Sequence, residues 1–205
     1  MTRIIAPVAA LVAALFIGGI WWATQGGQSA GIGQCTATKI AGDGNEIGGP
    51  FELVNAEGQT VTDKDVITEP SLIYFGYTFC PDVCPLDTAR NAEAVDILAE
   101  RGMSVTPVFI TIDPERDTPE QVGDFAFNLH EKMIGLTGSM EQVDAASKAY
   151  RTYYKHHDKS DEFYLVDHST FTYLVLPEQG FVEFFRRDVT AEAMADRVGC
   201  FVENA

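Results

Sequence analysis

Two cysteines, Cys80 and Cys84, are the residues of this chain whose type and spacing best suit chemistry. They lie in the stretch YFGYTFCPDVCPLD, with three residues between them and a proline directly after each. Residues four apart lie on the same face of a helix, so the two sulfur atoms could converge on one ion or form a disulfide. The stretch therefore predicts a redox dithiol, a metal clamp or a disulfide that merely closes a turn.

The position of the two cysteines favours the thiolate form. The apolar run at residues 71–79 predicts a buried strand, and we expect a helix to begin within residues 82–85. The free N–H groups and positive dipole end of that helix would lower the pKa of nearby thiols. Asp82 or Asp87 could cap the free N–H groups, although either carboxylate would oppose thiolate formation.

The elements around the dithiol alternate between strand and helix patterns. Thr118 and Thr190 are expected N-caps, and Gly102 is a stop signal. The predicted elements are a hairpin at 51–62, strands at 71–79 and 105–113, helices at 80–102, 118–133, 140–157 and 190–202, a strand or loop at 133–139, and a hairpin at 171–188.

This order predicts an α/β fold with a mixed sheet flanked by helices. It is a thioredoxin-like arrangement with an added N-terminal β-hairpin. The dithiol lies where a central strand ends and a helix begins. Reaction and ligand sites of open α/β sheets gather at that edge.

A third metal ligand is to be sought among the four histidines, because two thiolates and an imidazole suit Cu(I), or Zn(II) with a fourth ligand. His130 is expected near a helix C-terminus, and His156 and His157 in a solvated loop. His168 differs, since it stands just ahead of a strongly apolar strand whose start should lie beside the dithiol. His168 is thus either the third ligand or a hydrogen-bonded structural histidine.

The N-terminal segment predicts a membrane anchor. The stretch from Ile4 to Thr24 has no charged residue and would span about 31 Å as a helix. A cleaved signal peptide is the alternative, but its apolar part would be shorter, and bulky Gln28 disfavours cleavage before Gly31. We expect residues 1–24 to be an N-terminal transmembrane helix, 25–49 a flexible tether and 50–205 the globular domain.

Charge indicates where the domain works. Arg3 is the only charged side chain ahead of the apolar stretch, which weakly favours a domain outside the cytoplasm. A bacterial inner membrane with the domain in the periplasm is the simplest placement, and that compartment is oxidising. The net charge of −16 argues against a nucleic-acid partner.

Two further cysteines leave two alternatives open. Cys35 lies in the predicted tether and Cys200 in the last predicted helix. They could pair and fasten the tether to the domain. Equally, Cys200 could be a buried small hydrophobe and Cys35 a free thiol.

The chain resembles the Sco/SenC family of copper-binding assembly factors for cytochrome c oxidase. The matching segments are YFGYTFCPDVCP, FITIDPERDTPE, GLTGSMEQVDAASKAYRTYY and YLVDHSTFTYLV, in the expected order. The resemblance implies a thioredoxin-like fold and copper, as Cu(I), Cu(II) or both, bound by Cys80, Cys84 and His168. It also implies delivery of copper, or thiol reduction, to the binuclear copper site of oxidase subunit II.

Further expectations concern the surroundings of this site. Asp113 and Asp167 are candidates to orient the ring of His168; the alternative for Asp113 is a turn and helix-entry residue. A copper donor protein and a thiol reductant are expected partners.

Whether the protein is also an enzyme stays open. A thiol–disulfide oxidoreductase would use Cys80 and Cys84 as a redox dithiol without needing His168. A thiol peroxidase would want a hydroxyl and an arginine beside its cysteine. Thr78 is near Cys80, but Arg90 is ten residues on. A purely structural disulfide is the least favoured reading.

Overall fold

The computed structural model describes residues 31–37, 47–161 and 163–205. The predicted membrane anchor, residues 1–24, lies outside these ranges, and the predicted tether is described only at 31–37 and 47–49. In the ranges that are described, no helix combines the length and apolar character needed to cross a membrane.

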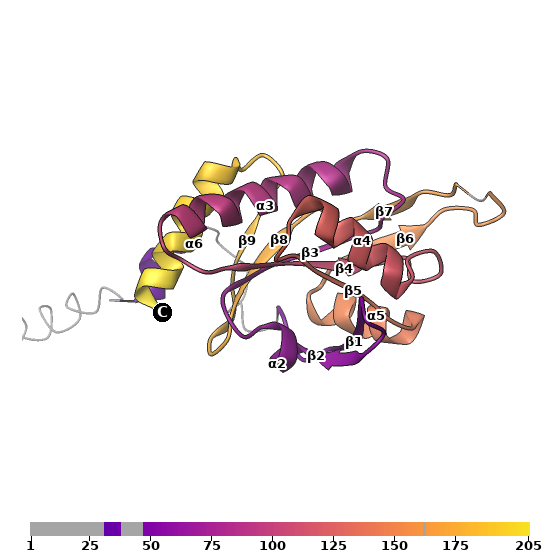
Figure 1. Ribbon diagram of the computed structural model, residues 1–205, viewed down its shortest axis with the longest axis horizontal. Helices are drawn as coiled ribbons and strands as arrows, with labels where there is room; N and C mark the ends of the chain where they lie inside the picture. Colours follow the sequence, from indigo (N-terminus) through magenta and orange to yellow (C-terminus); the bar gives the residue numbers. More distant parts are fainter. Residues whose placement is uncertain (1–30, 38–46, 162) are drawn as a thin grey trace, which may run out of the picture.

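A seven-stranded mixed sheet forms the centre of the domain (Figure 1). The middle strands β5, β4 and β3 are parallel to one another, whereas the outer strands pair antiparallel. The predicted N-terminal hairpin is present as β1 and β2. The strand order is β2 (Thr60–Thr62), β1 (Glu52–Asn55), β5 (Ile134–Thr137), β4 (Thr106–Thr111), β3 (Ser71–Gly76), β8 (Thr172–Leu176) and β9 (Gly180–Phe185).

Helices cover both faces of the sheet, as Figure 1 shows. The crossovers from β3 to β4 and from β4 to β5 advance in one direction across the sheet, so their two helices lie on one face. That face carries α3 (Val83–Glu100), α4 (Pro119–Leu129) and α6 (Ala191–Asn204), and the other carries α2 (Asp63–Val66) and α5 (Met140–Ala149). The predicted mixed sheet flanked by helices is therefore confirmed.

Strand β3 is the core strand that leads to the dithiol. All six of its residues are buried, which accounts for the unbroken apolar run in the sequence. Phe75 packs against Tyr150 and Tyr173, which come from the end of α5 and from β8. Because the strand is held on both faces, the loop that follows it starts from a fixed point.

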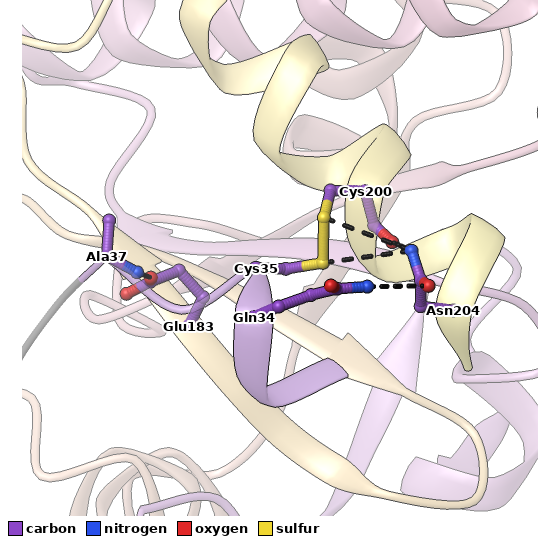
Figure 2. The surroundings of a disulfide bond; sticks show 6 residues. All are labelled: Gln34, Cys35, Ala37, Glu183, Cys200 and Asn204. Atoms are coloured by element: carbon purple, nitrogen blue, oxygen red, sulfur yellow. Dashed lines mark hydrogen bonds between the residues drawn. A yellow bond between two sulfur atoms is a disulfide. The ribbon is translucent and has the colours of Figure 1, made fainter. Parts of the chain in front are cut away.

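A disulfide between Cys35 and Cys200 ties the segment 31–37 to α6 (Figure 2). A 3-10 helix, η1 (Ile32–Gln34), leads into Cys35. The side chain of Gln34 donates to Asn204 of α6, and the N–H of Ala37 donates to buried Glu183 of β9. Of the two expectations for these cysteines, the structure has the disulfide.

The helix predicted at 140–157 is too long. Helix α5 ends at Ala149, because Arg151 adopts a left-handed conformation (φ 51°) and the N–H of Thr152 turns back to the carbonyl of Ser147. The following residues form β6 (Tyr154–His156), which pairs antiparallel with β7 (Val166–His168). The prediction of a solvated loop at His156 is therefore wrong.

Candidate metal centre

Three separate elements bring Cys80, Cys84 and His168 together. Cys80 lies in the loop after β3, Cys84 in the first turn of α3, and His168 at the end of β7. The Sγ atom of Cys84 is 3.3 Å from the Nε2 atom of His168. One ligand atom from each of the three residues lies within 4.8 Å of the other two. The residues named from the sequence thus form one compact group.

Gly76, the last residue of β3, makes room for the sulfur of Cys84. A Cβ atom at this position would lie 3.0 Å from that sulfur and 2.9 Å from the ring of Tyr74. Atoms cannot pack this closely without displacement. The sequence analysis did not identify Gly76, although a glycine at the end of an apolar strand often marks such a close approach.

The two thiols differ in protonation. Complete burial raises the pKa of Cys84 above its ordinary value. The pKa of Cys80 is lowered, first by hydrogen bonding with the Cys84 thiol and then by the backbone N–H groups of Asp82 and Cys84. The Cys84 N–H lies 3.4 Å from the Cys80 sulfur. The pair therefore shares one proton at neutral pH, held by Cys84, while Cys80 is a thiolate.

The ring of His168 is in the tautomer that a metal ligand requires. Its Nδ1 atom lies 2.9 Å from the carbonyl oxygen of Ser169, and a carbonyl can only accept, so Nδ1 carries the proton. The lone pair of Nε2 then faces Cys84. The rings of Tyr74 and Tyr77 stand nearly perpendicular to the His168 ring, and their centroids lie 6.2 and 5.9 Å from its centroid.

The two carboxylates expected to orient His168 lie elsewhere. Asp167 is 2.9 Å from the Nε2 atom of His157. Asp113 is fully buried and accepts hydrogen bonds from Tyr164 and Arg116. The carbonyl of Ser169 holds the ring in their place, and a backbone atom leaves no signature in side-chain types.

The expected caps of α3 also take other roles. Asp82 occupies the N-cap position, but its side chain makes no capping hydrogen bond. Asp87 is buried one turn beyond Cys84, where it accepts from the Tyr74 hydroxyl and the Arg187 guanidinium, each at 3.1 Å. The Arg187 guanidinium thus partly neutralises the negative charge of the Asp87 carboxylate, which is buried beside the thiol of Cys84.

The donor set fits a soft monovalent copper ion. Two sulfurs and one imidazole nitrogen, all partly or fully buried, match the ligand preference of Cu(I). A structural Zn(II) site takes four protein ligands, and the group found among the described residues supplies three. Cys84 is 0% exposed and Cys80 is 8% exposed, whereas His168 is half-buried, so the site is reached from the side of Cys80 and His168.

Comparisons with known proteins agree with this fold. A family model described as SCO1/SenC matches residues 40–203. Protein SenC of Rhodobacter capsulatus is 60% identical over 158 residues, which cover 77% of this chain and 72% of SenC. Copper-bound ScoI of Arabidopsis thaliana is 41% identical, with a TM-score of 0.73 over 78% of this chain and 99% of that one. Copper-bound ScoI of Bradyrhizobium japonicum is 35% identical, with a TM-score of 0.68 over 76% and 99%.

Proposed function

The chain belongs to the SCO1/SenC family, and we propose that it is a copper metallochaperone that delivers its ion to the binuclear copper site of cytochrome c oxidase subunit II. The proposed ligands are Cys80, Cys84 and His168. The observation that carries the proposal is the single group formed by their three ligand atoms, all within 4.8 Å of one another. The copper-bound relatives support copper as the cargo.

The proposed location is a bacterial inner membrane, with residues 1–24 as the anchor and the domain in the periplasm. The uncharged stretch from Ile4 to Thr24 supports the anchor. The disulfide between Cys35 and Cys200 supports the compartment, since disulfides persist outside the reducing cytoplasm. A copper donor protein and a thiol reductant are further proposed partners, because the ion must be supplied and the dithiol kept reduced.

The side chains divide the work of holding and releasing the ion. Cys80 offers a sulfur that is already deprotonated, and Cys84 gives up its proton to solvent when its sulfur becomes a ligand. His168 offers the Nε2 lone pair without any change of tautomer. A site with three ligands leaves room for thiolates of the receiving subunit to replace them one at a time.

Copper binding and transfer test the proposal. The full-length chain in detergent, reduced and anaerobic, should bind one Cu(I), measured by competition with a chromogenic chelator. Cys84→Ala and His168→Ala should each lose most of the affinity, whereas His130→Ala, at the far C-terminus of α4, should keep it. Transfer is followed by the copper content of the initially copper-free soluble domain of subunit II, measured after the two proteins are separated. Stoichiometric binding that survives both ligand changes would contradict the proposal.

A second function, thiol–disulfide reduction of that subunit, is favoured by the unequal pKa values of the two thiols. The Cys80 thiolate would attack a partner disulfide and form a mixed disulfide, releasing one partner thiolate. Cys84, deprotonated, would then displace the second partner thiolate and leave a Cys80–Cys84 disulfide. The two electrons come from the dithiol, and an external thiol reductant restores it.

His168 separates the two functions. A His168→Ala chain should still reduce a disulfide of subunit II, measured by thiol labelling of that subunit, because no step of the exchange uses the imidazole. The same variant should fail to transfer copper. Loss of both activities would show that reduction is not independent of the metal site.

A further inference from the structure

The turn between β4 and α4 contacts both halves of the metal centre. It runs from Thr111, the last residue of β4, to Thr118, the N-cap of α4. Two of its carboxylates, Asp113 and Asp117, are 0% exposed. A buried carboxylate is costly unless it is hydrogen-bonded, so the partners of each one indicate what it holds in place.

Asp113 holds the hairpin that presents His168. Its Oδ1 atom accepts a hydrogen bond from the Tyr164 hydroxyl at 2.6 Å. The Nε2 atom of His156 lies 3.3 Å from the same oxygen. Tyr164 lies two residues before the start of β7, and His156 is the last residue of β6. The carboxylate therefore contacts both sides of the β6–β7 hairpin. His168 is the other end of β7.

Asp117 holds the loop that presents Cys80. Its Oδ2 atom accepts the backbone N–H of Thr78 at 2.9 Å, and its Oδ1 atom accepts the Thr78 hydroxyl at 2.5 Å. The Thr111 hydroxyl donates to Oδ2 at 2.5 Å. Thr78 is two residues before Cys80, so this carboxylate fixes the path of the chain into the dithiol.

Arg116 joins the two halves. Its Nε atom donates to Asp113 at 2.5 Å, and its guanidinium lies 3.6 Å from the ring centroid of Tyr164. The same guanidinium lies 4.9 Å from the ring centroid of Phe79, the residue before Cys80. A cation between two aromatic faces is attracted to both. The turn therefore connects the hairpin and the cysteine loop by both hydrogen bonds and packing.

On the basis of the proposed function, we propose that Asp113 and Asp117 are positioning residues that set the separation between the His168 nitrogen and the two sulfurs. Asp113 acts through Tyr164 on the hairpin, and Asp117 acts through Thr78 on the loop. Loss of an outer contact of this kind typically lowers metal affinity about 10–100-fold. The two carboxylates should also be separable, because each holds a different half of the site.

Two single-hydroxyl variants test the separation. Tyr164→Phe removes the hydroxyl that reaches Asp113 and keeps the ring beneath Arg116. It should lower Cu(I) affinity about 10-fold or more and leave the alkylation rate of Cys80 unchanged. Thr78→Val removes the hydroxyl that reaches Asp117. This variant should change both the Cu(I) affinity and the alkylation rate of Cys80.

A matched control comes from the other end of the same strand. The Thr106 hydroxyl donates to Glu69 at 2.5 Å, at the start of β4. Thr106→Val removes an equally short hydroxyl–carboxylate contact that faces neither the hairpin nor the cysteine loop. It should leave Cu(I) affinity and Cys80 alkylation at their wild-type values.

Amide hydrogen exchange on the copper-free full-length chain measures how firmly the β6–β7 hairpin is held when no metal is bound. The N–H of Val166 is bonded to the Tyr77 hydroxyl at 3.4 Å, and the N–H of Ser169 to the carbonyl of Tyr153 at 2.9 Å. Both should exchange faster in Tyr164→Phe and at the wild-type rate in Thr106→Val. This readout applies whether or not copper is the cargo.

The outcomes divide cleanly. Wild-type exchange in Tyr164→Phe overturns the role of Asp113, and so does a lower melting temperature with unchanged Cu(I) affinity, since that pattern marks a merely structural contact. Unchanged alkylation and affinity in Thr78→Val overturn the role of Asp117. Failure of the wild-type chain to bind Cu(I) would instead contradict the proposed function, and the exchange rates would still test the hold on the hairpin.

Discussion

The Nε2 atom of His168 lies 3.3 Å from the Sγ atom of Cys84, although 84 positions separate the two residues in the chain. The carbonyl of Ser169 fixes the proton on the other ring nitrogen, so a lone pair faces the sulfur before any metal arrives. In the metal-free chain the Cys84 sulfur still carries a proton, which the thiol donates to the Cys80 thiolate. Copper must replace this proton, so copper affinity should weaken as pH falls.

Cys80 should stay reactive toward iodoacetamide at acidic pH, because the Cys84 thiol and nearby N–H donors lower its pKa. Cys84 should react much more slowly, since burial raises its pKa and hides the sulfur. Alkylation rates of each cysteine from pH 4 to 9, followed by peptide mapping of the copper-free chain, measure both.

The variant Cys84→Ala should shift the reactivity of Cys80 toward higher pH, because it removes the donor that lowers this pKa most. His130→Ala should leave the profile unchanged. Equal rates for the two cysteines across the pH range would contradict the assignment of the shared proton to Cys84.

Gly76→Ala should lower Cu(I) affinity by displacing the sulfur of Cys84, because the new methyl group would lie 3.0 Å from it. Overpacking of this kind also costs about 1–3 kcal/mol of unfolding free energy. Competition titration and thermal unfolding measure the two effects. Gly199→Ala on α6 is the control, since its nearest neighbour would be 3.4 Å away and alanine favours a helix. Unchanged affinity in Gly76→Ala would show that the sulfur can move without loss.

The sequence was sufficient to identify the two cysteines and to place them between β3 and α3, because an apolar run followed by a helix pattern has few other interpretations. It also singled out His168 by its place ahead of β8. The β6–β7 hairpin was not predicted because α5 ends where Arg151 adopts a left-handed backbone conformation. Glycine is the residue that usually marks such a helix end in a sequence. Without that hairpin, the contacts of Asp113 with His156 and Tyr164 could not be foreseen.

Contacts between segments that are far apart in the chain could not be predicted from the sequence, for a related reason. Cys35 and Cys200 are separated by 165 positions, and only the packing of residues 31–37 on α6 and β9 decides that they pair. The space that Gly76 leaves for a sulfur is likewise a property of β3 and α3 together. Local patterns predicted the elements, whereas these tertiary contacts depend on how the elements meet.

Removal of the disulfide by Cys35→Ala and Cys200→Ala should lower the free energy of unfolding by about 2–4 kcal/mol, the usual range for a native disulfide. Urea unfolding of the full-length chain measures the loss. A thiol reductant should bring the wild-type chain to the same stability and leave the double variant unaffected. Because neither cysteine belongs to the metal group, Cu(I) affinity should not change. Equal stability of the wild-type chain with and without reductant would contradict a stabilising role.

The stability contribution of Asp117 should depend on pH in a defined direction. Burial raises its pKa above the ordinary value of 3.8, with the Thr111 and Thr78 donors opposing the rise. The folded chain therefore binds this proton more tightly than the unfolded chain does. The contribution is then most favourable at low pH and declines as pH rises from about 4 through the folded-state pKa.

The variant Asp117→Asn removes this titration, so the difference in unfolding free energy between variant and wild type isolates it. Any fixed cost of the amide shifts that difference equally at every pH. The difference should move in favour of the variant as pH rises from about 4 and become level above the folded-state pKa. Urea unfolding at several pH values measures it, with Asp124→Asn, an exposed aspartate of α4, as the baseline for loss of an acidic side chain. A difference that moves toward the wild type over this window would mean that the hydrogen bonds from Thr78 and Thr111 outweigh burial and that Asp117 is held as a stabilised carboxylate.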